Sequence, residues 1–420
     1  MTPEIEKRIK AVQAGRVPAG YKRTAGGIVP NEWEETPLEK CLVEYKEKTT
    51  KPNQYPMLTS ARAALMLQSD YYSGHQVTTD DNVGYNVLPR GYVTFRSRSD
   101  DGRFKFNENN IIDKGIISYF YPVFSFNNHV DHKYMLFLLN ETIYRQMFPY
   151  NEGTAQMVLS FNKLKSLQYS IPPLSEQKKI AEILATQDRV IELKEKLIAE
   201  KQSQKKYLMQ TYLMKKKHSP LFQKKWKRIY LSEILKERRE CNELENLRIC
   251  SVAVNNGVVD QKEHLGKSMA AENTSNYAVV HYGDIVYTKS PTGAFPYGII
   301  KQSQLKEDVA VSPLYGVYEP YCYEIGYLLQ VYFSYANNAN NYLKPIVNKG
   351  AKNTILISNQ TFLKPSLYLP IDIEEIKYLY MLFKSTDEEI SLLQKDLEQE
   401  RLKKKSLMQL LLTGLVRVKV

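Results

Sequence analysis

Few residue groups in this sequence could perform catalysis, and each lacks a partner that the chemistry needs. Gly266-Lys267-Ser268 matches the end of a phosphate-binding loop, but Gln261 stands where that loop needs a glycine, so no phosphate cradle is expected. Pro172-Pro173 follows Ile171 rather than the Asn or Asp with which an adenine methyltransferase holds the reacting amino group. The dipeptide Pro-Asp, common in metal-dependent nuclease cores, does not occur.

The two closely spaced histidines, His129 and His132, could share a helix face. No clear acidic or cysteine partner accompanies them, and surface or packed histidines are the ordinary explanation. The sequence therefore predicts a protein that binds rather than catalyses, with no metal and no cofactor of its own.

Residue types suited to contact a nucleic acid gather in loop-like segments of the first half. Arginine after the strand-like run from Gly91 to Phe95 could bind guanine bidentately or contact a phosphate. A polar stretch around Gly74 suits a loop that enters a groove, and a small-residue turn at Gly153 suits a phosphate. A solvated turn is the alternative explanation in each case. The candidates are Tyr71, Tyr72, His75, Gln76, Arg96, Ser97, Arg98, Thr154 and Gln156.

The second half offers a corresponding set. Asparagine side chains pair well with adenine edges, and lysines beside a glycine turn can contact phosphate, although plain loops explain the same residues. The candidates are Lys289, Ser290, Thr292, Asn337, Asn338, Asn340, Asn341, Lys349 and Lys352.

Composition limits the classes of protein that can position these residues. A chain of 420 residues, 43% apolar and 25% charged, suits a soluble protein of two domains. There is no apolar run of 18 residues, the start is charged, and four cysteines show no CxxC spacing, so we expect a cytoplasmic protein. Of the net charge of +12, residues 163–228 carry +11, which favours a polyanion or an acidic partner nearby.

An internal repeat organises the chain. KKYLMQ at Lys205 and KKSLMQ at Lys404 are 199 residues apart, and apolar residues ahead of both match at the same offset. YNVLPRGYVTFRS from Tyr85 matches YAVVHYGDIVYTK from Tyr277, which places Lys289 at the position of Ser97. These matches occur in one order with slowly drifting offsets, so the repeat indicates a duplication.

The repeat predicts an arm (1–28), a globular unit (29–170), a helix (171–217), a second globular unit (218–370) and a second helix (371–420). Pro172-Pro173 and Pro370 mark the helix starts, since proline is tolerated in a first turn but not in a helix interior. Strand-like and helix-like runs alternate in both globular units, which favours an α+β fold.

Both predicted helices carry apolar residues at the heptad spacing of a coiled coil. Two such helices of opposite direction suit this topology, and roughly 45 residues would make a rod of about 65 Å. That length exceeds a helical turn of DNA, about 34 Å. The polar residues in the two seams specify one register. The seam residues are Ile180, Leu184, Gln187, Ile191 and Ile198 in the first helix and Leu379, Phe383, Thr386, Ile390 and Leu397 in the second.

Three segments resemble a known family. IPPLSEQKKIAEILATQDRVIELKEKLIAEKQSQKKYLMQTYL from Ile171 is similar to the central conserved helix of specificity subunits of type I restriction–modification enzymes. GYKRTAGGIVPNEWEETPLEKCL from Gly20 resembles the entry into the family's first target-recognition domain, and KKKSLMQLLLTGLVRV from Lys403 resembles its closing helix. The second helix lacks the PPLxEQ opening.

The resemblance implies a non-catalytic subunit that reads a split duplex DNA site, one half with each of two target-recognition domains. It further implies that the paired helices dock two adenine-N6 methyltransferase subunits and that an endonuclease/translocase subunit joins them. S-adenosylmethionine, ATP and magnesium would then be bound by the partner subunits. Without the resemblance, a structural adaptor with two protein-binding modules and a coiled-coil rod remains the alternative.

Overall fold

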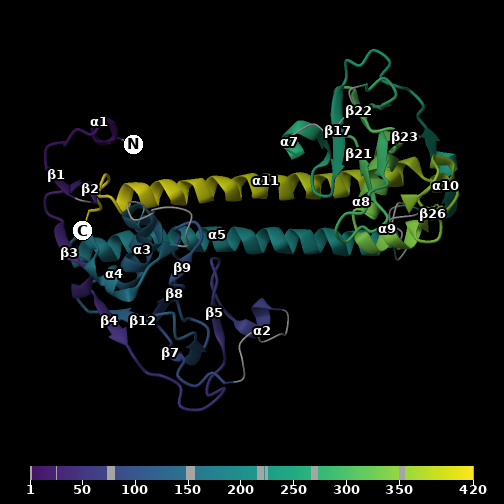
Figure 1. Cartoon of the computed structure of the whole chain (residues 1–420). Helices are drawn as coiled ribbons and strands as arrows, with labels where there is room; N and C mark the ends of the chain where they lie inside the picture. Colours follow the sequence, from purple (N-terminus) through teal and green to yellow (C-terminus); the bar gives the residue numbers. More distant parts are fainter. Residues whose placement is uncertain are drawn as a thin grey trace. The chain divides into compact units, whose positions relative to one another are not determined.

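The computed structural model describes residues 2–24, 26–72, 81–147, 157–214, 222, 226–265, 273–349 and 355–419, with the backbone alone at 264, 265 and 349. The chain divides into two compact units (Figure 1). Unit 1 comprises Met1–Lys194 and Asp396–Val420, and unit 2 comprises Glu195–Lys395. Among the described residues, no helix is long and apolar enough to cross a membrane.

Unit 1 is built around a four-stranded antiparallel sheet in the order β10-β8-β12-β4, formed by β4 (Leu42–Tyr45), β8 (Val93–Phe95), β10 (Phe106–Glu108) and β12 (Val123–Phe126). Phe95, Phe106 and Phe124 lie in one buried cluster with apolar residues of α3 (His132–Met147). Aromatic side chains bury a large apolar area, so this cluster fixes where the strand ends emerge.

The other strands of unit 1 form antiparallel pairs, and short helices connect them. The pairs are β1 (Tyr21–Thr24) with β2 (Gly27–Pro30), β3 (Glu34–Pro37) with β14 (Gln168–Ile171), β5 (Leu58–Ser60) with β6 (Leu65–Leu67), β7 (Asn86–Pro89) with β11 (Lys114–Ile117), and β9 (Arg98–Ser99) with β13 (Met157–Val158). The helices are α1 (Pro3–Gln13), η1 (Leu38–Lys40), α2 (Gln68–Tyr71) and α4 (Phe161–Ser166).

Unit 2 contains two four-stranded sheets. The first has the order β16-β23-β20-β21 and is antiparallel: β16 (Leu235–Glu237), β23 (Gly316–Pro320), β20 (Ile285–Thr288) and β21 (Ile299–Gln302). The second has the order β18-β17-β22-β19: β18 (Gly257–Asp260), β17 (Arg248–Ala253), β22 (Val309–Val311) and β19 (Ala278–Val280). Its β17 and β22 are parallel.

Among its described residues, unit 2 also has two strand pairs and five shorter helices. The pairs are β15 (Lys227–Tyr230) with β26 (Ser366–Leu369) and β24 (Asn348–Lys349) with β25 (Ile355–Leu356). The helices are α6 (Leu231–Ile234), α7 (Gln261–Leu265), α8 (Tyr323–Phe333), α9 (Ala336–Leu343) and α10 (Asn359–Leu363).

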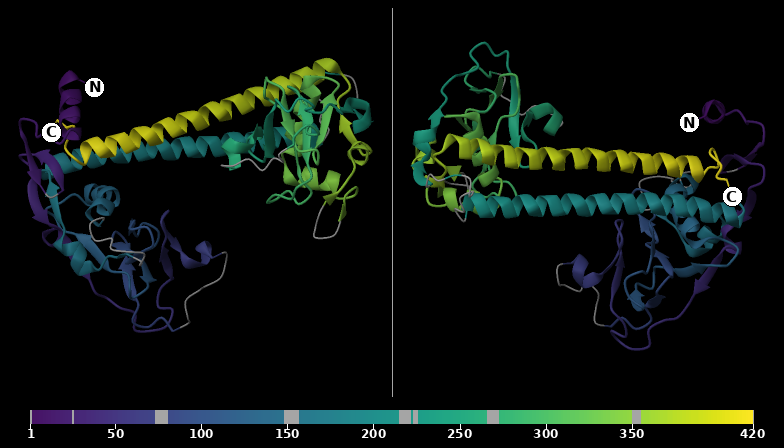
Figure 2. Two further views of the ribbon diagram at one scale, coloured as in Figure 1. Left: turned by 45° about the horizontal axis from the view of Figure 1, so that its top comes forward. Right: turned by 180° about the vertical axis from the view of Figure 1, so that it is seen from behind.

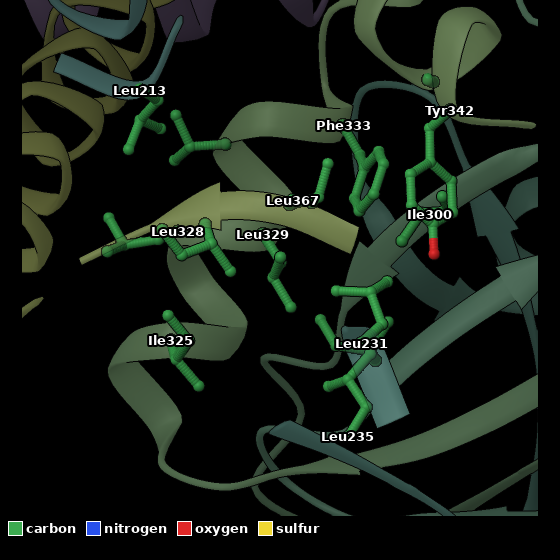
Figure 3. Close-up of a cluster of buried hydrophobic side chains, with 14 of the residues drawn as sticks. Leu213, Leu231, Leu235, Ile300, Ile325, Leu328, Leu329, Phe333, Tyr342 and Leu367 are labelled. Atoms are coloured by element: carbon green, nitrogen blue, oxygen red, sulfur yellow. The ribbon is translucent and has the colours of Figure 1, made fainter. Parts of the chain in front are cut away.

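The main core of unit 2 combines the first sheet with α6, α8, α9, α10, β26 and the long helices, while the second sheet has a core cluster of its own. Figure 3 shows leucines of α6, α8 and β26 directed at one another beside Ile300 of β21. Phe333 and Tyr342 pack with their rings 5.0 Å apart, and the Tyr342 hydroxyl donates to the Phe362 carbonyl oxygen. The buried tyrosine thus satisfies its polar atom inside an apolar cluster.

The predicted α+β repeat is confirmed by the topology of the two units. Read in matching direction, β10-β8-β12-β4 of unit 1 corresponds to β21-β20-β23-β16 of unit 2, and the pair β3·β14 corresponds to β15·β26. Even the helix caps repeat: Ser160 accepts the backbone N–H of Lys163 before α4, and Ser358 accepts that of Thr361 before α10. The two halves therefore share one plan.

The two long helices are α5 (Leu174–Met209), which ends in a short π-type turn at Gln210–Met214, and α11 (Ile373–Leu411). In each unit, the halves of these helices lie side by side and antiparallel (Figures 1 and 2). In unit 1, Lys194 and Asp188 form ion pairs with Asp396 and Lys404. In unit 2, Lys201 pairs with Glu389.

Eight of the ten predicted seam residues are buried, whereas Ile191 and Thr386 are half-buried. The two polar members of the seam act differently. The Gln187 amide donates across the pair to the Glu400 carbonyl and carboxylate oxygens, at 3.1 and 2.7 Å. The Thr386 hydroxyl donates to Leu382 of its own helix, so a register-setting role across the seam is wrong for Thr386.

Candidate nucleic-acid interface

The buried strand β8 delivers three of the predicted residues to the surface of unit 1. Its residues Val93 to Phe95 are fully buried, and Arg96 and Arg98 directly after them are exposed. Ser97 between them donates its hydroxyl to the Phe120 carbonyl oxygen at 2.7 Å. The arginine segment is thereby tied to the loop that precedes β12.

This second loop was not predicted, although it carries the largest exposed aromatic side chains near the arginines. Tyr119 and Phe120 are 54% and 59% exposed, and their ring centroids are 4.1 Å apart. Burial raises the pKa of Tyr121, with Arg96 lowering it and Tyr72 raising it, so both side chains act on this hydroxyl. The run of aromatic residues in SYFYPVF, from Ser118, is the sequence signal that could have predicted this loop.

A turn beside these residues is fixed by an exposed carboxylate. Asp101 accepts the Ser99 hydroxyl and the Arg103 backbone N–H and forms a two-point ion pair with Arg62. Burial raises the pKa of Asp101, and the hydrogen bonds with the Arg62 charge outweigh this, so the pKa lies below its usual value. The turn therefore holds Arg98 and Arg103 at defined positions on the surface.

The aromatic pair Tyr71 and Tyr72 lies at the end of the short helix α2, 49% and 40% exposed, with the rings edge to face. Exposed tyrosines of this kind can stack on bases or donate to phosphates. His75, Gln76, Thr154, Gln156, Lys352 and the side chain of Lys349 lie outside the described residues. Their predicted contacts with DNA stay predictions.

In unit 2, the segment after β20 corresponds to the arginine segment but has different chemistry. Ser290 and Thr292 are exposed, while Lys289 is half-buried and donates to the Asn359 side chain at 3.0 Å. Burial lowers the pKa of Lys289. Lys289 therefore attaches α10 to the sheet, and the free surface of this segment is that of Ser290 and Thr292.

The asparagine cluster is a helix, α9, rather than the plain loop favoured by the sequence. The prediction that Asn338 contacts DNA is wrong, because this side chain is 2% exposed and donates to the Tyr332 carbonyl oxygen. Asn337 and Asn341, four residues apart, are exposed. Asn340 donates to the Ala294 carbonyl oxygen at 3.2 Å, which brings the helix against the segment that contains Ser290 and Thr292.

No group of three or more histidine, cysteine, aspartate or glutamate side chains that could hold a metal ion exists among the residues that the structure describes. What both units do place on the surface are polar, cationic or aromatic side chains on loops anchored at the ends of buried strands. Such an arrangement is suited to groove and phosphate contacts.

Comparison with known proteins agrees with this chemistry. Residues 36–202 match the family model described as type I restriction modification DNA specificity domain. The chain is 23% identical over 443 residues to a putative type I restriction enzyme MjaX specificity subunit of Methanocaldococcus jannaschii, with 95% of this chain and 97% of that protein covered.

Two solved structures share the fold. The S subunit of a type I restriction–modification system from M. genitalium has a TM-score of 0.54 at 13% identity, covering 92% of this chain and 97% of that one. A chain from a structural study of complex assembly and conformational transition of the type I system has a TM-score of 0.50 at 13% identity, covering 92% and 99%.

Proposed function

We propose that the chain is a specificity subunit of a type I restriction–modification enzyme and that its two units read the two halves of a split duplex DNA site. The protein is thus the DNA-recognition subunit of a larger enzyme and performs no catalysis itself. The methyl donor S-adenosylmethionine, ATP and magnesium are expected on partner subunits.

One observation carries this proposal: the same strand end is exposed in both units, with unlike side chains. After β8, unit 1 offers Arg96 and Arg98, and after the corresponding β20, unit 2 offers Ser290 and Thr292. A shared scaffold holds the two loops in the same local setting, while arginine and hydroxyl side chains favour different base edges. The two half-sites are therefore expected to differ in sequence.

The long helices also supply candidate contacts for partner subunits. Leu193 of α5 and Leu392 of α11 occupy equivalent positions, 199 residues apart, and are 49% and 65% exposed. Both point away from the seam, since they fall between the seam positions of their helices. Exposed leucines repeated in this way favour two copies of one partner, and the methyltransferase subunit is the partner we propose.

The proposal is tested by DNA footprinting of the complex between this chain and its methyltransferase partner. We expect two short protected patches separated by an unprotected gap, and a steep fall of affinity with salt. Replacing Arg96 and Arg98 with alanine should weaken protection of one patch first, whereas Arg239→Ala, an exposed arginine of unit 2, should not. A single continuous footprint, or DNA affinity insensitive to salt, would instead favour the adaptor.

A further inference from the structure

A polar cleft in unit 2 contains a lysine whose charge is not balanced by the protein. The cleft has a volume of about 430 Å³ and is lined by β21, α8, the turn of the β17–β18 hairpin and the two long helices. Lys301 of β21 lies in this lining and is 8% exposed. Its neighbours Ile300 and Gln302 are fully buried in the sheet, so the strand holds Lys301 rigidly.

The acidic residue of the cleft is already neutralised by other groups. Asp387 of α11 forms an ion pair with Lys205 of α5 at 2.5 Å and accepts the Tyr327 hydroxyl at 2.6 Å. Within the described part of the chain, no hydrogen bond or ion pair reaches the Lys301 ammonium group. Burial and the Lys205 charge lower the pKa of Lys301, and Asp387 offsets this only in part.

A buried cation without a partner is costly, so its retention needs a reason. A ligand that brings negative charge into the cleft would supply the missing partner. The rest of the lining suits such a ligand, because Asn255 and Asn256 are exposed at the hairpin turn and can donate through their amides. The turn, Lys205 and Lys301 thus face one cleft from three elements.

The ion pair of this cleft occurs a second time in unit 1. Asp188 and Lys404, at the repeat positions of Asp387 and Lys205, also form an ion pair at 2.5 Å. Lys105, which directly precedes β10, lines a cleft beside this ion pair, but by strand register the residue equivalent to Lys301 is Asn107. Burial and Lys404 lower the pKa of Lys105, and the three residues line a cleft of about 560 Å³.

We propose that the unit 2 cleft is a phosphate-binding site, in which Lys301 and Lys205 contact the non-bridging oxygens of one phosphate. Lysine is a compact point charge and a common phosphate ligand, and the cleft has donors on several sides. On the proposed function, on which this step of the inference rests, the phosphate belongs to the backbone of bound duplex DNA. The site then contributes affinity and position rather than sequence reading.

The test compares the salt dependence of duplex binding by the methyltransferase complex with Lys301→Met and with Lys301→Arg. Loss of one phosphate contact should reduce the slope of log K against log salt by about 0.9, which is about an eightfold loss of affinity at about 0.1 M salt. Lys301→Arg should keep the slope of the unmodified protein. Lys306→Met, which removes an exposed lysine four residues beyond β21, is the matched control and should also keep it.

Folding is checked separately by thermal unfolding, where Lys301→Met should be at least as stable as the unmodified chain because an unpaired buried charge is gone. The inference would be overturned if Lys301→Met left the slope of log K against log salt unchanged. It would also be overturned if Lys301→Arg reduced that slope as much as Lys301→Met. If inorganic phosphate or ATP raises the unfolding temperature only when Lys301 is present while the DNA slope is unchanged, the backbone source is wrong. A shallow slope in the unmodified complex would instead count against the proposed function itself.

Discussion

Arg417, which follows α11, is predicted to hold unit 1 together through a buried carboxylate. Glu176, in the first turn of α5, has a side chain that is 3% exposed. Arg417 donates to both of its carboxylate oxygens, at 2.7 and 2.9 Å, and the Trp33 indole N–H donates to one of them at 3.2 Å. Hydrogen bonds with Glu176 and Glu32 raise the pKa of Arg417, which keeps its guanidinium group charged.

Replacing Arg417 with methionine keeps much of the side-chain volume and leaves Glu176 charged without its main partner. Breaking a buried ion pair costs about 3–5 kcal/mol. The Arg417 side chain is 32% exposed, so water screens part of this interaction, and we expect a loss of about 2–3 kcal/mol. For a unit of this size, that corresponds to a decrease of about 4–12 °C in melting temperature.

The assay is thermal and urea unfolding of the unmodified chain, Arg417→Met, Glu176→Gln and the double variant. Because the neutral amide needs no cation, the double variant should be more stable than Arg417→Met alone. Arg401→Met, which removes an exposed arginine from α11, should change stability by less than about 0.5 kcal/mol. Two results would refute this reasoning. One is a melting temperature of Arg417→Met equal to that of Arg401→Met. The other is a loss of stability in the double variant equal to the sum of the losses in Arg417→Met and Glu176→Gln.

Two further predictions concern titration and the helix seam. Burial lowers the pKa of His281, but its hydrogen bonds to Glu240 and Asp308 outweigh this effect, so folding raises the pKa. The protonated imidazole therefore stabilises the folded protein. This stabilisation is complete below the unfolded pKa of about 6.5 and is lost as the pH rises through the folded pKa. Urea unfolding from about pH 5 to about pH 9 should show this decline, and His281→Gln should remove it. Gln187→Leu should raise the melting temperature by a few degrees, about 1 kcal/mol, because a polar seam residue costs stability; a decrease would mean that its bonds to Glu400 stabilise the pair.

The sequence predicted the scaffold because its signals are local or repeated. Proline fixed the start of α5 just after Pro172-Pro173, and the heptad spacing identified Leu184 and Phe383 as buried seam residues. The duplication made the strand predictions firmer, because a weak strand pattern such as YAVVHYGDIVYTK is supported by the matching segment in the other half of the chain. The matching sheet orders of the two units follow from the same repetition.

The surface of the reading loops was less predictable, because it depends on contacts between segments distant in sequence. Asn338 and Asn341 look alike in the sequence, yet only the fold decides that Asn338 bonds to the Tyr332 carbonyl oxygen inside the core. The exposure of Phe120 likewise depends on the Ser97 hydrogen bond that fixes its loop. Residue type indicates what a side chain can bind, whereas burial decides whether it can bind anything.

The ion pairs between α5 and α11 show why duplication and antiparallel packing reinforce each other. Asp188 of α5 pairs with Lys404 of α11 in unit 1, and Lys205 of α5 pairs with Asp387 of α11 in unit 2. These are one interaction with the roles of the helices exchanged, since each residue is 199 positions from its equivalent. One complementary pair of charges therefore serves at both places, which makes antiparallel pairing of duplicated helices self-consistent in the manner of a symmetric dimer. The reading loops face no such constraint, so they are free to differ.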